Sequence, residues 1–124
     1  MSMRTPIARV RGLGAAKSGT QHWWMQRLTA IALVPLTVWF VVSVIYLTGA
    51  DYAHVRAWLA SPLSAILMLL LIAATFYHLQ LGLQVIIEDY VHGEAAKLGC
   101  IIGVKLASFA LAVTAAFAVL KVAF

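Results

Sequence analysis

The sequence predicts an all-α integral membrane protein with three transmembrane helices. The chain has 124 residues, of which 64% are hydrophobic and only 10% are charged, and a soluble domain of this size could not bury so much apolar surface. Three apolar runs, at about 28–48, 62–87 and 98–120, are each long enough to cross a hydrocarbon core of roughly 30 Å at about 1.5 Å per residue. Because lipid offers backbone amides no hydrogen-bond partner, each run is expected to be helical.

Local signals support the first two spans and the link between them. Trp23 and Trp24 stand just before the first span, where aromatic rings suit lipid headgroups. Pro35 lies inside this span and is expected to kink it. Pro62 opens the second span, in a first turn that tolerates proline. The link at 48–61 is expected to contain a turn.

The net charge of +5 predicts a topology rather than a nucleic-acid partner, because the basic residues cluster before the first span instead of forming a patch. We therefore divide the chain into a basic cytoplasmic segment, residues 1–27, and a three-helix anchor, residues 28–124. With the N-terminus cytoplasmic, the second link is also cytoplasmic and the C-terminus lies on the far side. The basic residues before the first span are Arg4, Arg9, Arg11, Lys17 and Arg27.

His78 is the most informative residue, because it lies deep inside the second apolar run. Placing an imidazole within a membrane span costs free energy, so such a residue is expected to bind a partner or a ligand there. At about 100° per residue, Gly82, Val85 and Asp89 share its helix face. Gly82 would leave a bare patch on which a flat macrocycle bound to His78 could lie. One alternative is a hydrogen bond from His78 to another helix. Zinc would need further ligands at metal spacing, whereas a haem iron shared with a partner's histidine fits one ligand from this chain.

A polar cluster closes the second span. Tyr90 is either an aromatic-belt residue or a hydrogen-bond donor to a carbonyl of a lipid-soluble substrate. Asp89 either belongs to the solvated link, orients Tyr90, or pairs with Arg27, which lies at the same end of its own helix. Arg27 is equally well explained as a topology charge. His22 is expected to anchor the first helix at the interface.

Other residues are given structural roles. Gln80 and Gln84 lie opposite His78 and are expected to hydrogen-bond a neighbouring helix. Lys105 is expected to snorkel towards the headgroups, and no chemistry is assigned to it. Cys100 is expected to be a small packing residue. A stripe of small residues on the third span predicts close packing against another helix, and consists of Gly99, Gly103 and Ala107.

Two motifs make the chain similar to a known family. His78-x-x-x-Gly82, followed by Asp-Tyr-Val-His-Gly at 89–93, resembles the signature of the D-type hydrophobic membrane anchor of succinate dehydrogenase. That enzyme is the succinate:quinone oxidoreductase, respiratory complex II. The stretch at 19–30 is similar to the family's entry into its first helix, and the likeness extends over nearly the whole chain. The version here looks like the alphaproteobacterial and mitochondrial branch. Gln84 departs from the pattern, because it follows His78 by six residues where related sequences often place a glutamine at seven.

The resemblance implies roles for four residues. His78 would be one axial ligand of the iron of a b-type haem. The second ligand would come from the C-type cytochrome b anchor subunit, with which this chain would pack into a haem-binding helical bundle. Tyr90 would hydrogen-bond the ubiquinone headgroup and Asp89 would support that site. Arg27 would lie near the haem propionates and the quinone pocket.

The resemblance also implies partners and a place in metabolism. Flavoprotein and iron–sulfur subunits would oxidise succinate on the cytoplasmic side and pass electrons to ubiquinone, as a step of the tricarboxylic acid cycle and aerobic respiration. The chain would lie among the lipids of a bacterial inner membrane, with a periplasmic C-terminus, and would have no activity alone. Two alternatives stay open: an anchor of a fumarate reductase, and a small non-redox membrane protein of three helices.

Overall fold

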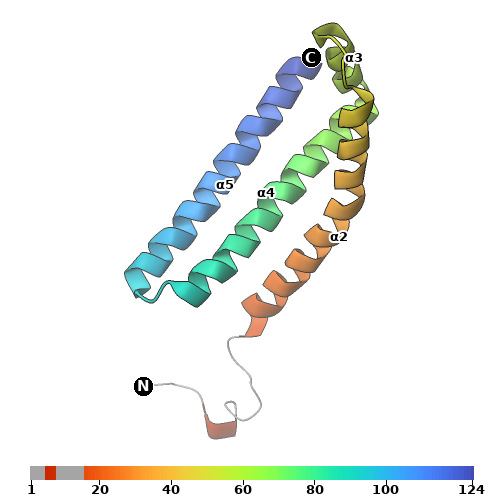
Figure 1. Ribbon diagram of the computed structural model, residues 1–124. Coiled ribbons are helices and arrows are strands. Elements are labelled where there is room, and N and C mark those ends of the chain that lie inside the picture. The colour runs from red at the N-terminus through yellow and green to blue at the C-terminus, as the bar shows by residue number, and fades with distance from the viewer. Residues whose placement is uncertain (1–4, 8–15) are drawn as a thin grey trace.

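The computed structural model describes residues 5–7 and 16–124, and this part of the chain is built from helices (Figure 1). The long helices are α2 (Ala16–Tyr46), α4 (Pro62–Tyr90) and α5 (Glu94–Ala123), and a short helix, α3 (Tyr52–Ala60), lies between the first two. All three long helices are apolar enough to cross a membrane, which confirms the predicted fold class and its three spans. The predicted topology charges Arg4, Arg9 and Arg11 lie outside the described residues.

Helix α2 extends beyond its apolar run. It begins at Ala16, so the boundary predicted at residue 27 lies inside a continuous helix. Residues 16–27 contain no proline, and their polar and tryptophan side chains suit a headgroup layer, so the helix can leave the hydrocarbon without ending. Pro35 lies inside α2, and Figure 1 shows that the helix bends along its length, as expected where proline removes a backbone hydrogen bond.

The first link contains a helix that the sequence did not predict. The expected turn is present at Gly49, whose φ of 82° is the left-handed conformation that glycine favours. Asp51 then caps α3, because its side-chain oxygen accepts a hydrogen bond from the backbone N–H of His54 at 2.9 Å. Trp58 of α3 stacks on Trp39 of α2, with 5.7 Å between ring centroids. The link thereby packs onto the ends of the spans.

The three long helices form a layer with α4 in the middle. Within the described residues, α4 contacts both α2 and α5, whereas α2 and α5 have no contact with each other, as Figure 1 also shows. The side chains buried between them are mostly small, which allows close approach of helices in lipid. The buried residues of the long helices are Thr29, Ser43, Ser64, Ala65, Leu81, Ser108, Val119 and Ala123, and Leu59 is buried on α3.

The small-residue stripe of α5 does not serve the packing within this chain. Gly99, Gly103 and Ala107 are all exposed, and a Cβ added at either glycine would meet no atom within 4 Å. Helix α5 instead packs on α4 through the face that contains the buried Ser108. The stripe therefore points away from α4, towards lipid or another subunit.

The seam between α2 and α4 is held by polar contacts as well as by small side chains. His22 of α2 lies with its Nε2 3.2 Å from the backbone oxygen of Leu81 on α4, so this residue joins two helices and is more than an interfacial anchor. One turn further along α2, Gln26 lies beside Gly82. A Cβ added at Gly82 would be 3.7 Å from the Nε2 atom of Gln26, which is an ordinary van der Waals distance.

The space at Gly82 leads to a prediction for stability. Gly82→Ala should fit without displacing Gln26 and should stabilise the protein by up to about 1 kcal/mol, because alanine is the better helix former. Gly82→Leu should push Gln26 out of the seam and lower the stability. The thermal unfolding midpoints of the two purified variants in detergent measure this. A Gly82→Ala midpoint that falls as far as that of Gly82→Leu would show that the seam is tighter than described.

Candidate functional site

His78 lies in the seam between α2 and α4, about halfway along its helix. Its side chain is half-buried, and its Nδ1 is 3.0 Å from the hydroxyl oxygen of Thr29 on α2. Thr29 itself is buried, with 7% of its surface exposed. The imidazole is therefore held by a hydroxyl from the neighbouring helix, and one of its two ring nitrogens is already engaged.

The hydrogen bonds of Thr29 favour one tautomer of His78. The Thr29 hydroxyl donates to the backbone oxygen of Met25 at 2.8 Å, and the backbone oxygen of Gln26 lies 3.1 Å away. A hydroxyl has one proton, and here it points towards backbone carbonyls. With that proton on either carbonyl, the hydroxyl oxygen accepts from His78, and the imidazole then carries its proton on Nδ1 and keeps the Nε2 lone pair free.

This is the form in which histidine binds metals. A neutral imidazole whose N–H is fixed by a second group presents its other nitrogen as a ligand. Within the described residues, Nε2 of His78 has no hydrogen bond, and no group of three or more His, Cys, Asp or Glu side chains could hold a metal ion. These residues thus provide one nitrogen ligand at this place, which suits an iron that receives its other ligands from a macrocycle and a partner chain.

Gln26 is the residue that the sequence did not single out. The Oε1 atom of Gln26 is buried and has no hydrogen-bond partner, and an unsatisfied buried acceptor costs about 1–3 kcal/mol. Its side chain also covers part of the patch that was expected to be bare at Gly82. A bound group that approaches His78 on this side would meet the Gln26 amide, which offers it an unpaired acceptor.

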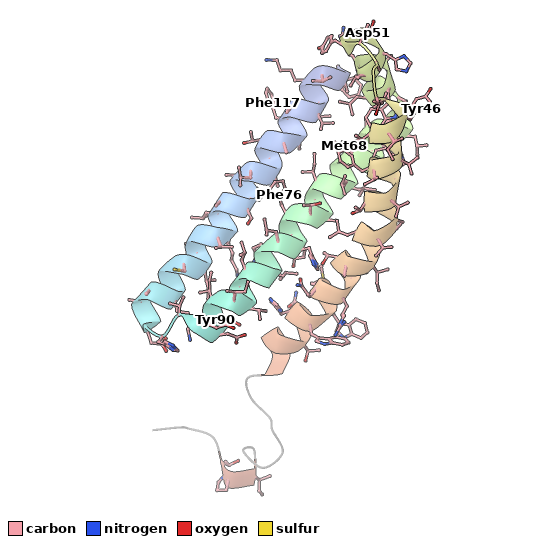
Figure 2. All side chains as sticks on the ribbon, in the orientation of Figure 1. Tyr46, Asp51, Met68, Phe76, Tyr90 and Phe117 are labelled. Atoms are coloured by element: carbon pink, nitrogen blue, oxygen red, sulfur yellow. The ribbon has the colours of Figure 1, made fainter. Side chains whose placement is uncertain are left out.

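Tyr90 and Asp89 lie far from His78, at the end of α4. Figure 2 shows Tyr90 at this end of the helix. Eleven residues separate His78 from Asp89, a rise of about 16 Å along an α-helix. Both side chains are exposed, Tyr90 by 76%, and neither has an ion pair or hydrogen bond from its side chain within residues 16–124. In the structure, His78 therefore lies apart from Asp89 and Tyr90 on the same helix, and the three residues do not form a single cluster.

The possible pairing of Arg27 with Asp89 is absent from the structure. Arg27 lies with its guanidinium carbon 5.2 Å from the centroid of the Trp23 ring, a cation–π distance. The reason is helical geometry: Trp23 and Arg27 are four residues apart and share a face of α2, whereas Thr29, which contacts α4, is about 160° away from Arg27 around the helix. Arg27 therefore points away from the α2–α4 seam.

Within residues 16–124, the hydrogen bonds that Gln80 and Gln84 could make to a neighbouring helix are also absent. Instead the Gln80 amide donates to Gln84 at 3.2 Å, and the Gln84 amide donates to the carboxylate of Glu88 at 3.0 Å. Residues four apart are neighbours on a helix surface, so this ladder forms along α4 itself. It lies beside a groove of about 620 Å³ that α2, α4 and α5 line together.

Comparison with known proteins supports the likeness found in the motifs. Residues 1–120 match the family described as succinate dehydrogenase/fumarate reductase transmembrane subunit. No solved structure matches the chain significantly.

Curated relatives named succinate dehydrogenase hydrophobic membrane anchor subunit are similar over most of their length. The relative from Rickettsia bellii is 36% identical over 105 residues, which cover 85% of this chain and 84% of the relative. The one from Rickettsia conorii is 32% identical over 117 residues, covering 94% and 91%. The one from Paracoccus denitrificans is 32% identical over 100 residues, covering 81% and 78%. The chain therefore belongs to the family of succinate dehydrogenase hydrophobic membrane anchor subunits.

Proposed function

We propose that this anchor provides one axial ligand of a haem b and part of the ubiquinone-reduction site of succinate dehydrogenase. The observation that carries the proposal is the contact between Thr29 and His78, which leaves Nε2 as a free nitrogen donor inside a membrane span. Electrons from succinate oxidation would then reach ubiquinone at the membrane surface, in a reaction of the tricarboxylic acid cycle and aerobic respiration.

The residues around His78 fit a haem shared between two subunits. His78 would give the iron one nitrogen, and a second histidine would come from a C-type cytochrome b anchor packed against this chain. Thr29 would keep the imidazole in the Nδ1–H form and fix its orientation, as partners of metal-bound histidines do. When bound, the haem would supply a one-electron redox centre between the helices.

Tyr90 and Asp89 fit the edge of a quinone site that other subunits complete. The phenol of Tyr90 can donate a hydrogen bond to a quinone carbonyl, and Asp89 is its neighbour at the end of the helix. Because Tyr90 is 76% exposed, and small-molecule sites usually enclose most of their ligand, further walls must come from partners. We assign these walls to the iron–sulfur subunit and the C-type anchor, with the flavoprotein subunit beyond.

We propose that Arg27 binds a group at the end of the assembly where Tyr90 and Asp89 lie. Its guanidinium lies over Trp23 and points away from α4, so it faces outward towards a partner subunit. Stacking leaves the N–H edge of a guanidinium open, and this edge suits a haem propionate or the quinone pocket. A direct ion pair between Arg27 and Asp89 forms no part of the proposal.

The orientation of the chain follows from the proposed partners and from charge. The start of α2 and the link between α4 and α5 lie at the same end of the layer in Figure 1, and this end would face the cytoplasm in a bacterial inner membrane. The basic residues at and before Arg27 would hold it there. The C-terminus at the end of α5 would then be periplasmic.

Replacement of Thr29 tests the role of its hydroxyl. Thr29→Val keeps the shape of the side chain but removes the acceptor for the Nδ1–H group, so His78 becomes a weaker electron donor to the oxidised iron. The midpoint potential of the haem should rise by up to about 60 mV, the limit for a hydrogen bond of about 1.5 kcal/mol that stabilises only the oxidised haem. Potentiometric titration of the purified complex measures it.

A second threonine provides the control for this experiment. Thr114 on α5 is exposed, and its hydroxyl donates to the backbone oxygen of Ala110 at 2.8 Å, so Thr114→Val removes a hydroxyl far from His78. It should leave the potential unchanged. Equal potentials in the wild-type and Thr29→Val complexes would refute the assigned hydrogen bond.

Replacement of Tyr90 tests the quinone site. Tyr90→Phe removes one hydrogen-bond donor, and succinate:ubiquinone turnover should fall about two- to tenfold if that bond contributes about 0.5–1.5 kcal/mol. Succinate oxidation with a water-soluble artificial acceptor should stay unchanged, because the flavin and iron–sulfur centres are in other subunits. Tyr52→Phe, at an exposed tyrosine on α3, is the matched control. Full ubiquinone turnover in Tyr90→Phe would remove Tyr90 from the site.

A further inference from the structure

The groove between α2, α4 and α5 lies on the other side of the α2–α4 seam from His78. It exists because α2 and α5 both pack on α4 without contacting each other. Gln80 lies on its α4 wall, two residues and therefore about 160° away from His78 around the helix. The volume of about 620 Å³ is within the range of about 300–1,000 Å³ that is typical of small-molecule sites.

The lining of this groove is amphiphilic along its length. Near the ends of the helices that carry Tyr90 and Glu94, it contains the polar side chains of Gln21, His22 and Gln84. Deeper in the layer it is formed by apolar groups, among them Phe76 and Phe109, and Figure 2 shows Phe76 in the middle part of α4. A groove that is polar at its entrance and apolar deeper in the layer matches a lipid, which has a polar headgroup and apolar acyl chains.

Lys105 supplies a cation at this groove. It lies eleven residues after Glu94 on α5, about 16 Å along the helix, and it lines the groove while having no ion pair within the described residues. No Asp or Glu lines the groove. The nearest carboxylate in sequence on α4 is Glu88, one turn beyond Gln84 and held by its amide. A cation within a membrane span is costly without a partner, so the groove favours an anionic ligand.

We propose that this groove binds one anionic phospholipid from the leaflet on the Tyr90 side of the membrane. Its phosphate would pair with the ammonium group of Lys105, and the second N–H of the Gln84 amide could donate a hydrogen bond to it. One acyl chain would lie between Phe76 and Phe109. Basic pockets between transmembrane helices are suited to such headgroups. The site is separate from both proposed redox sites, because His78 and Tyr90 are not among the residues that line it.

Binding of phosphatidylglycerol to the intact, delipidated complex tests the proposal. Native mass spectrometry in detergent gives the apparent Kd of the tightest lipid adduct, with phosphatidylcholine as the neutral comparison. One lysine near a headgroup should favour the anionic lipid about fivefold, and Lys105→Gln should abolish this preference. Lys121→Gln removes the same charge at the opposite end of α5 and should keep it.

A second variant tests the apolar part of the groove. Ala73→Phe adds an aromatic ring to the lining at an exposed position, and should weaken binding of both lipids while Lys105 is kept. The proposal fails if Lys105→Gln and Lys121→Gln bind phosphatidylglycerol equally. It also fails if Lys105→Gln releases a subunit with no change in lipid binding, since the lysine would then pair with a carboxylate of another protein.

Discussion

The hydrogen bond between Thr29 and His78 is the interaction on which the rest of the account depends. It joins α2 to α4 at a buried point of their seam, with 3.0 Å between the Thr29 hydroxyl oxygen and Nδ1 of His78, and it holds in place an imidazole that lies among apolar residues. The bond is possible because the helices approach closely there, with small or flexible side chains along both faces. A weak and local interaction thus sets both the packing of two spans and the chemistry that His78 can offer.

The three-helix layer leaves much of its own surface uncovered. Only 6% of the most apolar window of α4 is buried within the chain, although α4 is the central helix. The glycine stripe of α5 and the phenol of Tyr90 are exposed. In a membrane, lipid can cover apolar side chains, whereas a stripe of small residues suits close contact with another helix. These open faces are what a subunit of a larger assembly requires.

The sequence predicted the fold well where hydrophobic length decides the structure. The second span begins at Pro62 as expected, and the three long helices follow the three apolar runs. The sequence did not predict α3, because the length of an apolar run does not determine this helix. Asp51 caps α3 and Trp58 holds it against α2, and neither contact produces a periodic hydrophobic pattern in the sequence.

For the site, the sequence predicted positions better than partners. The face of His78 followed from helical geometry, but the buried Thr29 hydroxyl and the unpaired amide of Gln26 depend on how α2 is rotated against α4. The same rotation turns Arg27 away from the seam, so the pairing with Asp89 that the sequence left open does not form. Gln80 and Gln84 bond within their own helix, because a partner four residues away is always within reach. Helix packing decides these side-chain partners, and the spacing of residues along the sequence does not reveal them.

The most direct test of the central claim is the visible difference spectrum, dithionite-reduced minus oxidised, of the complex purified through a tag on this chain. We expect the spectrum of a b-type haem with two histidine ligands in the wild-type complex. The His78→Leu complex, with all subunits still present, should lose this spectrum or show an altered ligand set. An unchanged b-type spectrum in His78→Leu would contradict the account, because both axial ligands would then come from elsewhere.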